Sequence, residues 1–149
     1  MLNEQLRDNI SYLKDIAYVE FTADVTITST VEATPTDVVS AGAITFAATP
    51  IEISFFTSAL ETAAATSASV VVNLWDGATN LGRIGQITTS AAAVSRAPMN
   101  VVTRLTPTAG SHTYKITAYQ ANGNGLVRAG TGGSGNYRPG YIRIRGIPS

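Results

Sequence analysis

The sequence predicts an all-β protein, an antiparallel jelly-roll-like β-sandwich of about eight to nine strands preceded by a short N-terminal helix. Two observations carry this prediction. Apolar and polar residues alternate with a period of two in many short segments, as they do in strands with one buried face. Residues typical of turns separate these segments, and the alternation of strands with helices that a parallel sheet needs is not visible.

The helix is expected over residues 3–16, where Asn3 is a suitable N-cap and Glu4 lies in the first turn. Five positions repeat with the 4-3-4-3 spacing of a coiled-coil seam: Leu2, Leu6, Asn9, Leu13 and Ile16. They form either a face packed on the rest of the chain or the oligomer interface of a parallel coiled coil, with Asn9 fixing the register. Because so short a helix is marginal in water, it needs a partner in both cases. We therefore predict an oligomerisation or docking helix at residues 1–17 and a sandwich domain at residues 18–149.

The first strand is expected over residues 19–27, in which odd positions are apolar and even positions are polar. Further strands are expected over residues 43–48, 51–58, 69–75, 82–89, 99–105, 113–120, 126–129 and 141–145. Residues 59–68 fit a helical turn and a polar loop equally well.

Turn-forming residues lie between these strands, and the Asn-Gly-Asn-Gly sequence at residues 122–125 is the strongest short hairpin pattern. Residues 130–135 match the glycine pattern G-x-G-x-x-G of dinucleotide sites. No helix can begin at residues 136–140, so we expect a long loop between the last two strands instead. Exposed loops on a rigid sandwich often contact partners. The candidates for partner binding are Asn122, Asn124, Asn136, Tyr137 and Arg138.

Charged residues make up 13% of the chain, about half of the usual share, which favours a surface partly covered by other subunits. Residues 1–61 hold nine acidic and two basic residues, whereas the remainder holds one acidic and eight basic residues. A sandwich whose first and last strands are neighbours explains this division. We therefore expect Glu20 and Asp24 to face Arg143 and Arg145 on the adjacent strand.

His112 is the only histidine, and neither a nucleophile elbow nor a nearby acidic residue accompanies it in the sequence. It stands at the head of the alternating series Tyr114, Ile116 and Ala118, so a role at the end of a buried strand is expected. The acidic residues do not form the close pair that glycosidases use, and one histidine without cysteine leaves no metal site. We predict that the protein is not an enzyme and has no catalytic, metal-binding or cofactor-binding residue.

Two other classes of binding have weak support. The seven arginines after residue 61 are scattered, so nucleic acid is not an expected partner. Trp75, Tyr119, Tyr137 and Tyr141 fit either a sugar-binding platform or packing in the core and at its rim, and the second interpretation is the simpler one. No apolar run nears the roughly 18 residues that cross a membrane, and no signal peptide is visible, so we expect a protein made in a cytoplasm.

Two segments resemble motifs of tailed-bacteriophage structural proteins. Residues 2–10, LNEQLRDNI, resemble the LN-x-Q-[LI]-R-D-N helix near the start of domains in such proteins. Residues 109–116, AGSHTYKI, are similar to the AGSHT-[YF]-K-[LIV] penultimate-strand motif of fibre and head-fibre modules, which often form trimeric jelly rolls of the TNF/C1q type. The resemblance implies a virion protein that trimerises and attaches through its N-terminal segment. Both motifs are structural, so no catalytic residue is carried over.

We therefore expect a non-enzymatic virion structural protein, a homotrimeric capsid decoration or head-fibre component that is made in the host cytoplasm. Its expected partners are other copies of itself and virion proteins such as capsid, portal or tail. The alternative is a receptor-binding tip of the tail that binds a glycan or another group on the host surface.

Overall fold

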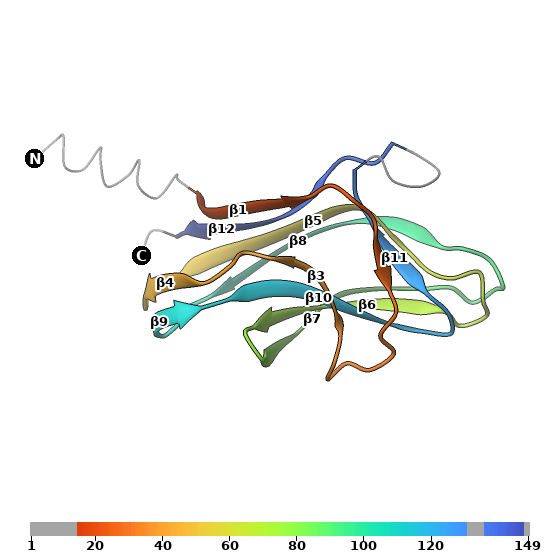
Figure 1. Cartoon of the computed structure of the whole chain (residues 1–149), viewed down its shortest axis with the longest axis horizontal. Helices are drawn as coiled ribbons and strands as arrows, with labels where there is room; N and C mark the ends of the chain where they lie inside the picture. Colours follow the sequence, from red (N-terminus) through yellow and green to blue (C-terminus); the bar gives the residue numbers. More distant parts are fainter. Residues whose placement is uncertain (1–14, 131–135, 148–149) are drawn as a thin grey trace, which may run out of the picture.

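The computed structural model describes residues 15–130 and 136–147, and every regular element within them is a β-strand (Figure 1). The strands form a jelly-roll-like sandwich of two antiparallel sheets, with a two-stranded ribbon at one end. They are β1 (Asp15–Phe21), β2 (Val25–Ile27), β3 (Thr36–Ser40), β4 (Ile44–Ala47), β5 (Ile51–Glu61), β6 (Ser69–Asp76), β7 (Thr79–Thr88), β8 (Arg96–Leu105), β9 (Ala109–His112), β10 (Tyr114–Ala121), β11 (Gly125–Arg128) and β12 (Gly140–Gly146).

β5 is the central strand of the larger sheet, whose order is β1-β12-β5-β11-β2, with β8 paired to the other edge of β5. The first half of β5 pairs with β12 and its last residues pair with β11, while β8 runs along its whole length. β5 has 11 residues, which is enough to hold two partners in succession on one edge. Figure 1 shows β1, β12, β5 and β8 together as one layer.

The smaller sheet has the order β3-β10-β6-β7 and forms the second layer (Figure 1). The ribbon of β4 and β9 extends from the same end as the start of β5. The chain crosses between the layers several times, which is how a sandwich rather than one large sheet arises.

One hydrophobic core fills the space between the two sheets. In β12, Ile142 and Ile144 are fully buried, whereas the alternate residues Arg143 and Arg145 face outward. The larger sheet adds Phe55 and other inward positions, and the smaller sheet adds the buried faces of β6 and β10. Each such aliphatic or aromatic side chain contributes roughly 1.5–3 kcal/mol by leaving water. The period of two that is visible in the sequence therefore becomes the inside and the outside of the sandwich.

Each strand expected from the alternation is present, with shifts of a few residues at its ends. The single strand expected over residues 19–27 is instead divided into β1 and β2. β1 pairs with β12, and β2 pairs with β11. Since a long connection separates β11 from β12, the chain that pairs with both must break between them. Of residues 59–68, the first three belong to β5 and residues 62–68 contain no helix, so the loop alternative is correct for residues 62–68 only.

The alternation does not predict β3 or β9, which lie within or beside segments expected to be turns. The hairpin expected at residues 122–125 is wrong, because β10 and β11 belong to different sheets and this turn carries the chain across the sandwich. β9 and β10 are separate strands divided at Thr113, and two further strands follow them, so the segment at residues 109–116 is not a single penultimate strand.

The first and last strands are neighbours, as the charge distribution predicts, because β1 and β12 pair antiparallel in the larger sheet. The predicted charge pairs are wrong, however. Glu20 lies opposite Tyr141, and Asp24 lies beyond the end of β1, where its carboxylate accepts a hydrogen bond of 2.6 Å from Arg128. The sequence alone could not place these acids, because the register of two strands depends on the residues that pack beneath them.

Asp15 is the acidic residue that contacts the two outward arginines of β12. Its Oδ1 lies 2.7 Å from Arg145 Nε and 4.0 Å from Arg143 Nε. β1 thus begins within the segment expected to be helical, while residues 1–14 lie outside the described residues. Of the five predicted oligomer-interface residues, only Ile16 is described, and its side chain is 43% exposed on β1. The N-terminal oligomerisation helix stays a prediction for the preceding residues.

Candidate binding cleft

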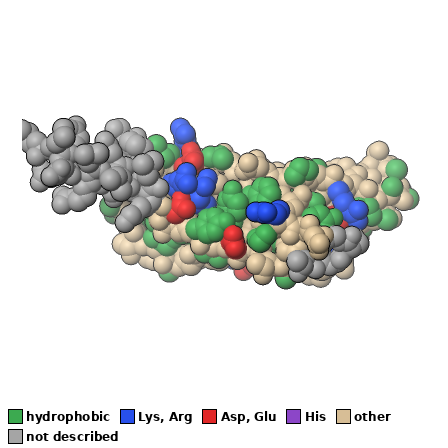
Figure 2. All heavy atoms as spheres, turned by 90° about the horizontal axis from the view of Figure 1, so that it is seen from above, with side chains coloured by type: hydrophobic (Ala, Val, Ile, Leu, Met, Phe, Trp, Pro, Cys, Tyr) green, Lys and Arg blue, Asp and Glu red, His purple; other side chains and the backbone are tan. Residues whose placement is uncertain are grey.

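The outer face of the larger sheet carries an open cleft of about 430 Å³, a volume typical of small-ligand sites. Four lining residues form one row across four neighbouring strands: Glu20 of β1, Tyr141 of β12, Phe56 of β5 and Asn100 of β8. Residues opposite each other on neighbouring strands point to the same face, so these side chains stand side by side. Figure 2 shows hydrophobic side chains gathered on this face beside acidic and basic groups. The lining is completed by Tyr18, Arg138 and Pro139.

Three aromatic rings form the apolar part of the cleft. The ring centroid of Tyr141 lies 5.2 Å from that of Tyr18 and 5.6 Å from that of Phe56, with interplanar angles of 35° and 27°. These are favourable separations for aromatic pairs, so the three rings support one another. Tyr18 is 47% exposed, which is a large fraction for an aromatic residue in a sheet. The cleft therefore presents aromatic surface to solvent.

Polar groups border the aromatic rings. The Tyr18 hydroxyl donates a hydrogen bond of 2.7 Å to Oε1 of Glu20, and this bond is the main cause that raises the pKa of Tyr18. The phenol thus stays protonated at neutral pH and holds the carboxylate in place. The exposed amide of Asn100 adds a donor and an acceptor, and the exposed guanidinium of Arg138 adds donors only.

A charged row lies four residues further along β12, β5 and β8, on the same face. It consists of Asp15, Arg145, Glu52 and Arg104, which are opposite one another on β1, β12, β5 and β8. Arg104 Nη2 lies 3.1 Å from Glu52 Oε2, and Arg145 pairs with Asp15. Because its charges alternate, this row neutralises itself. It lies outside the cleft and carries no net charge.

His112 does have an acidic partner, contrary to the expectation from the sequence. Its Nδ1 lies 2.5 Å from Oδ2 of Asp76, and its Nε2 donates to the carbonyl of Thr108 at 3.0 Å. The hydrogen bond with Asp76 is the main cause that raises the pKa of His112. The ring also stacks on Tyr114, with centroids 5.8 Å apart. Since both nitrogens are occupied, His112 joins β9 to the β6–β7 turn and has no nitrogen left to act as a base.

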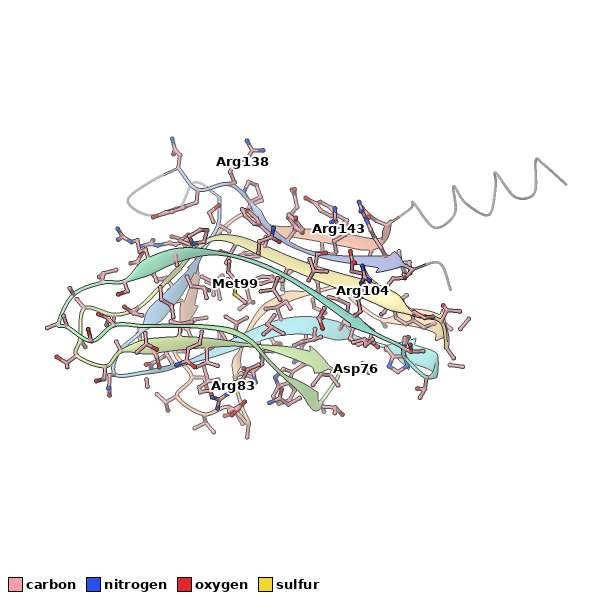
Figure 3. All side chains as sticks on the ribbon, turned by 180° about the vertical axis from the view of Figure 1, so that it is seen from behind. Asp76, Arg83, Met99, Arg104, Arg138 and Arg143 are labelled. Carbon is pink, nitrogen blue, oxygen red and sulfur yellow. The ribbon has the colours of Figure 1, made fainter. Side chains whose placement is uncertain are left out.

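Glu32 organises a second polar cluster, on the outer face of the smaller sheet. It lies in the connection between β2 and β3, and its carboxylate binds Arg83 at 3.0 Å and Asn73 at 2.8 Å. The hydrogen bond from Arg83, followed by that from Asn73, lowers the pKa of Glu32 to about 2. These bonds hold the β2–β3 connection against the sheet. Figure 3 shows Arg83 in this layer, on the side of the sandwich opposite to Arg138 and Arg143.

The four aromatic residues considered for a sugar platform do not come together. Trp75 and Tyr119 belong to the smaller sheet, and Trp75 is only 8% exposed. The ring of Tyr137 lies over the guanidinium of Arg128 at 5.6 Å. Of these four residues, only Tyr141 lines the cleft.

The sequence analysis missed Tyr18 and Phe56 as binding residues. Tyr18 stands in the polar phase of the alternation in β1, and this outward-facing aromatic is the pattern that could have revealed the site. Phe56 follows the inward-facing Phe55, so it must point outward, yet two adjacent phenylalanines look like core in the sequence.

Of the predicted partner-binding loop residues, the structure brings only Arg138 to the cleft. Asn122 and Asn124 are exposed in the turn that joins the two sheets, where the Asn122 amide donates to the carbonyls of Thr66 and Ser67. Asn136 is exposed, and Tyr137 covers Arg128.

Within residues 15–130 and 136–147, no three His, Asp or Glu side chains are grouped as a metal ion needs. In the same part of the chain no helix has the length and apolar character to cross a membrane.

The architecture defines a jelly-roll-like β-sandwich with a ligand-sized cleft on one sheet face. Among solved structures, the chain is similar to the C-terminal domain of EclA, a sugar-binding protein, with a TM-score of 0.39, 11% identity and coverage of 84% of this chain and 75% of that one. It is also similar to a carbohydrate-binding module, CBM6cm-2, of Cellvibrio mixtus lichenase 5A in complex with cellotriose, with a TM-score of 0.34, 14% identity and coverage of 93% and 94%. Likenesses this remote carry no argument about function. No protein-family model and no curated protein matches the sequence.

Proposed function

We propose that this chain is a non-enzymatic binding module that holds a glycan in the cleft on the outer face of the larger sheet. The observation that carries the proposal is the cluster of Tyr18, Tyr141 and Phe56 in an open cleft that also presents a carboxylate, an amide and a guanidinium. This arrangement supports the receptor-binding tip more than a purely structural decoration protein.

A sugar ring matches both kinds of surface in the cleft. Its C–H groups form an apolar and slightly positive face, which packs well on aromatic rings because their faces are negative. Its hydroxyl groups donate and accept hydrogen bonds, and Glu20, Asn100 and Arg138 offer acceptors and donors beside the rings. A purely apolar ligand leaves these three groups unpaired, which costs binding free energy.

Two features support a role without catalysis. Hydrolysis of a glycosidic bond commonly uses two carboxyl groups that flank the bond, and Glu20 is the one carboxylate among the described residues that line the cleft. His112 is engaged at both ring nitrogens and lies on β9, outside the cleft. The cleft is therefore equipped to hold a sugar and not to cleave it.

We also propose that the module is carried by a bacteriophage particle as a homotrimer. The support for this setting is the resemblance of residues 2–10 and 109–116 to phage structural proteins. Labelling of virions with an antibody against the sandwich, followed by electron microscopy, tests it, and label at the tail tip is the expected result. A sedimentation measurement that finds only monomers of the full chain contradicts the trimer.

The test of glycan binding is the variant Tyr18→Ala, with Leu81→Ala as the matched control. The two side chains are equally exposed, at 47% and 46%, but Leu81 lies on β7 in the other sheet. Glycan-array screening of the wild-type chain identifies a ligand, and calorimetry then measures its affinity for each variant. Tyr18→Ala is expected to weaken binding about tenfold, since losing an aromatic contact of roughly 1–1.5 kcal/mol corresponds to that ratio. Unchanged affinity in Tyr18→Ala, or an equal loss in Leu81→Ala, contradicts the proposal.

A further inference from the structure

Among the residues that the structure describes, Arg138 is the one lysine or arginine with no carboxylate oxygen of another described residue within 4.0 Å. Each of the other basic side chains there has such a partner: Arg83 has Glu32, Arg96 has Glu61, Arg104 has Glu52, Lys115 has Asp37, Arg128 has Asp24 and Glu61, and Arg145 has Asp15. Arg143 is the weakest case, because its Nε lies at the 4.0 Å limit from Asp15 and makes no hydrogen bond. Most basic side chains of this charge-poor chain thus lie close to its own carboxylates, and the exception, Arg138, lines the cleft.

The backbone of Arg138 is held in place on the larger sheet. Its carbonyl accepts hydrogen bonds from Ser58 Oγ at 2.9 Å and from the amide of Gly130 at 3.3 Å. Pro139 follows directly, which restricts Arg138 to an extended backbone conformation. The backbone that carries the guanidinium is therefore fixed, and Figure 3 shows Arg138 on the outer side of the sandwich. The fixed backbone reduces the conformational entropy that this residue loses on binding.

Gly130 and Tyr137 also fix the backbone near Arg138. The amide of Tyr137 donates to the carbonyl of Gly130 at 2.8 Å, and the Tyr137 ring lies over the buried Arg128. Gly130 has φ +72°, and a Cβ atom at this position would lie 1.6 Å from the carbonyl oxygen of Thr22. Only glycine fits here, so the close approach of the backbone to Thr22 sets the position of Arg138.

The two charged groups of the cleft do not neutralise each other. Glu20 is bound by the Tyr18 hydroxyl, and Arg138 lies beyond the 4.0 Å limit of an ion pair with it. A ligand that satisfies both brings hydroxyl donors to Glu20 and an anionic acceptor to Arg138. A guanidinium binds a carboxylate with two parallel hydrogen bonds, which gives strength and orientation.

We propose, on the basis of the glycan-binding function above, that the ligand is an acidic saccharide whose sugar carboxylate is bound by Arg138. The three aromatic side chains bind the sugar ring, and Arg138 distinguishes the acid from its neutral counterpart. Arg138 is thus the residue that determines specificity, while Tyr18, Tyr141 and Phe56 provide the binding surface that all sugars share.

The experiment compares matched ligand pairs in which the sugar carboxylate is either free and charged or methylated and neutral. Oligomers of galacturonic acid and of glucuronic acid, and the methyl esters of both, are titrated by calorimetry into the full chain and into Arg138→Ala, Arg138→Lys and the control Arg104→Ala. Arg104 is also an exposed arginine on this sheet face, but it pairs with Glu52 outside the cleft. For at least one pair, the wild-type chain is expected to bind the acid at least about tenfold more tightly than the ester. Arg138→Ala is expected to reduce this ratio to within twofold, and Arg104→Ala to leave it unchanged.

The variants separate the inference from the proposed function. Arg138→Lys is expected to lie between wild type and Arg138→Ala, because lysine keeps the charge but lacks the planar fork. Equal binding of acid and ester by the wild-type chain, with both lost in Tyr18→Ala, overturns the inference and leaves glycan binding supported. A preference for the acid that survives in Arg138→Ala also overturns it. If no acid and no ester binds, the inference is overturned, and the neutral glycans of the array then decide the proposed function on their own.

Discussion

Arg128 of β11 is the centre of a buried ion cluster, and its replacement by methionine is a direct test of how the sandwich is held together. Its Nε and Nη2 each donate to an oxygen of Glu61 at 2.9 Å, and its Nη1 donates to Asp24 at 2.6 Å. The three side chains are 9%, 8% and 14% exposed, respectively. Arg128→Met keeps most of the volume of the side chain but leaves Asp24 without a cation and Glu61 with Arg96 alone.

The expected loss of stability is about 3–5 kcal/mol, the usual cost of removing one partner from a buried ion pair. This is a large share of the roughly 5–15 kcal/mol by which a domain is stable. Arg96→Met is the control, since Arg96 also contacts Glu61 but is 48% exposed. Its loss is expected to be clearly smaller, because Arg128 still binds both oxygens of Glu61.

The pH dependence of this loss identifies its cause. Burial raises the pKa of Glu61, but the hydrogen bonds from Arg128 and Arg96 outweigh it, so the pKa is lowered from 4.5. In the wild type this contribution is present above pH 4.5 and is lost as the pH falls through the lowered pKa. In Arg128→Met burial dominates and the pKa rises, so the deficit is expected to be largest at neutral pH and to shrink in acid.

Urea unfolding of wild type and both variants, followed by the fluorescence of the single buried Trp75, measures these differences. A loss below about 1 kcal/mol at pH 7 in Arg128→Met, typical of an exposed pair, refutes the reasoning. A loss equal to that of Arg96→Met, or one that does not shrink in acid, does so as well.

Two further changes test the remaining contacts. Because Asp76 raises the pKa of His112, the stability from this pair is present below pH 6.5 and is lost as the pH rises through the folded pKa. Asp76→Asn is expected to lower the pKa of His112, measured by NMR titration, toward 6.5. An unchanged titration contradicts the assigned contact. Gly130→Ala is expected to cost more than the roughly 1–2 kcal/mol of a left-handed backbone alone, since its Cβ meets the Thr22 carbonyl, and also to weaken glycan binding by displacing Arg138. Urea unfolding and calorimetry measure both effects, and wild-type values in the two assays speak against a fixed Arg138.

Much of the fold is predictable because apolar and polar residues alternate with a period of two in most strands. Alternation in β1, β10 and β12 identifies both the strand and its buried face. β3 and β9 escape prediction because turn-forming residues lie within or directly beside them and hide the alternation. The Asn-Gly turn at residues 122–125 is recognised as a turn but not as a crossing between sheets, since turn residues specify local dihedral angles and not the partner of the next strand.

The set of residues that line the cleft is not predictable from the sequence. The sequence by itself determined the all-β class, the outward position of Glu20, and the adjacency of oppositely charged end strands. Only the tertiary structure decided that Glu20 lies opposite Tyr141 and not an arginine, that Phe56 joins the same row, and that His112 meets Asp76. The physical reason is that strand register is set by the fit of many buried side chains at once. A shift of two residues keeps every apolar residue inside but assembles a different set of side chains on the outer face.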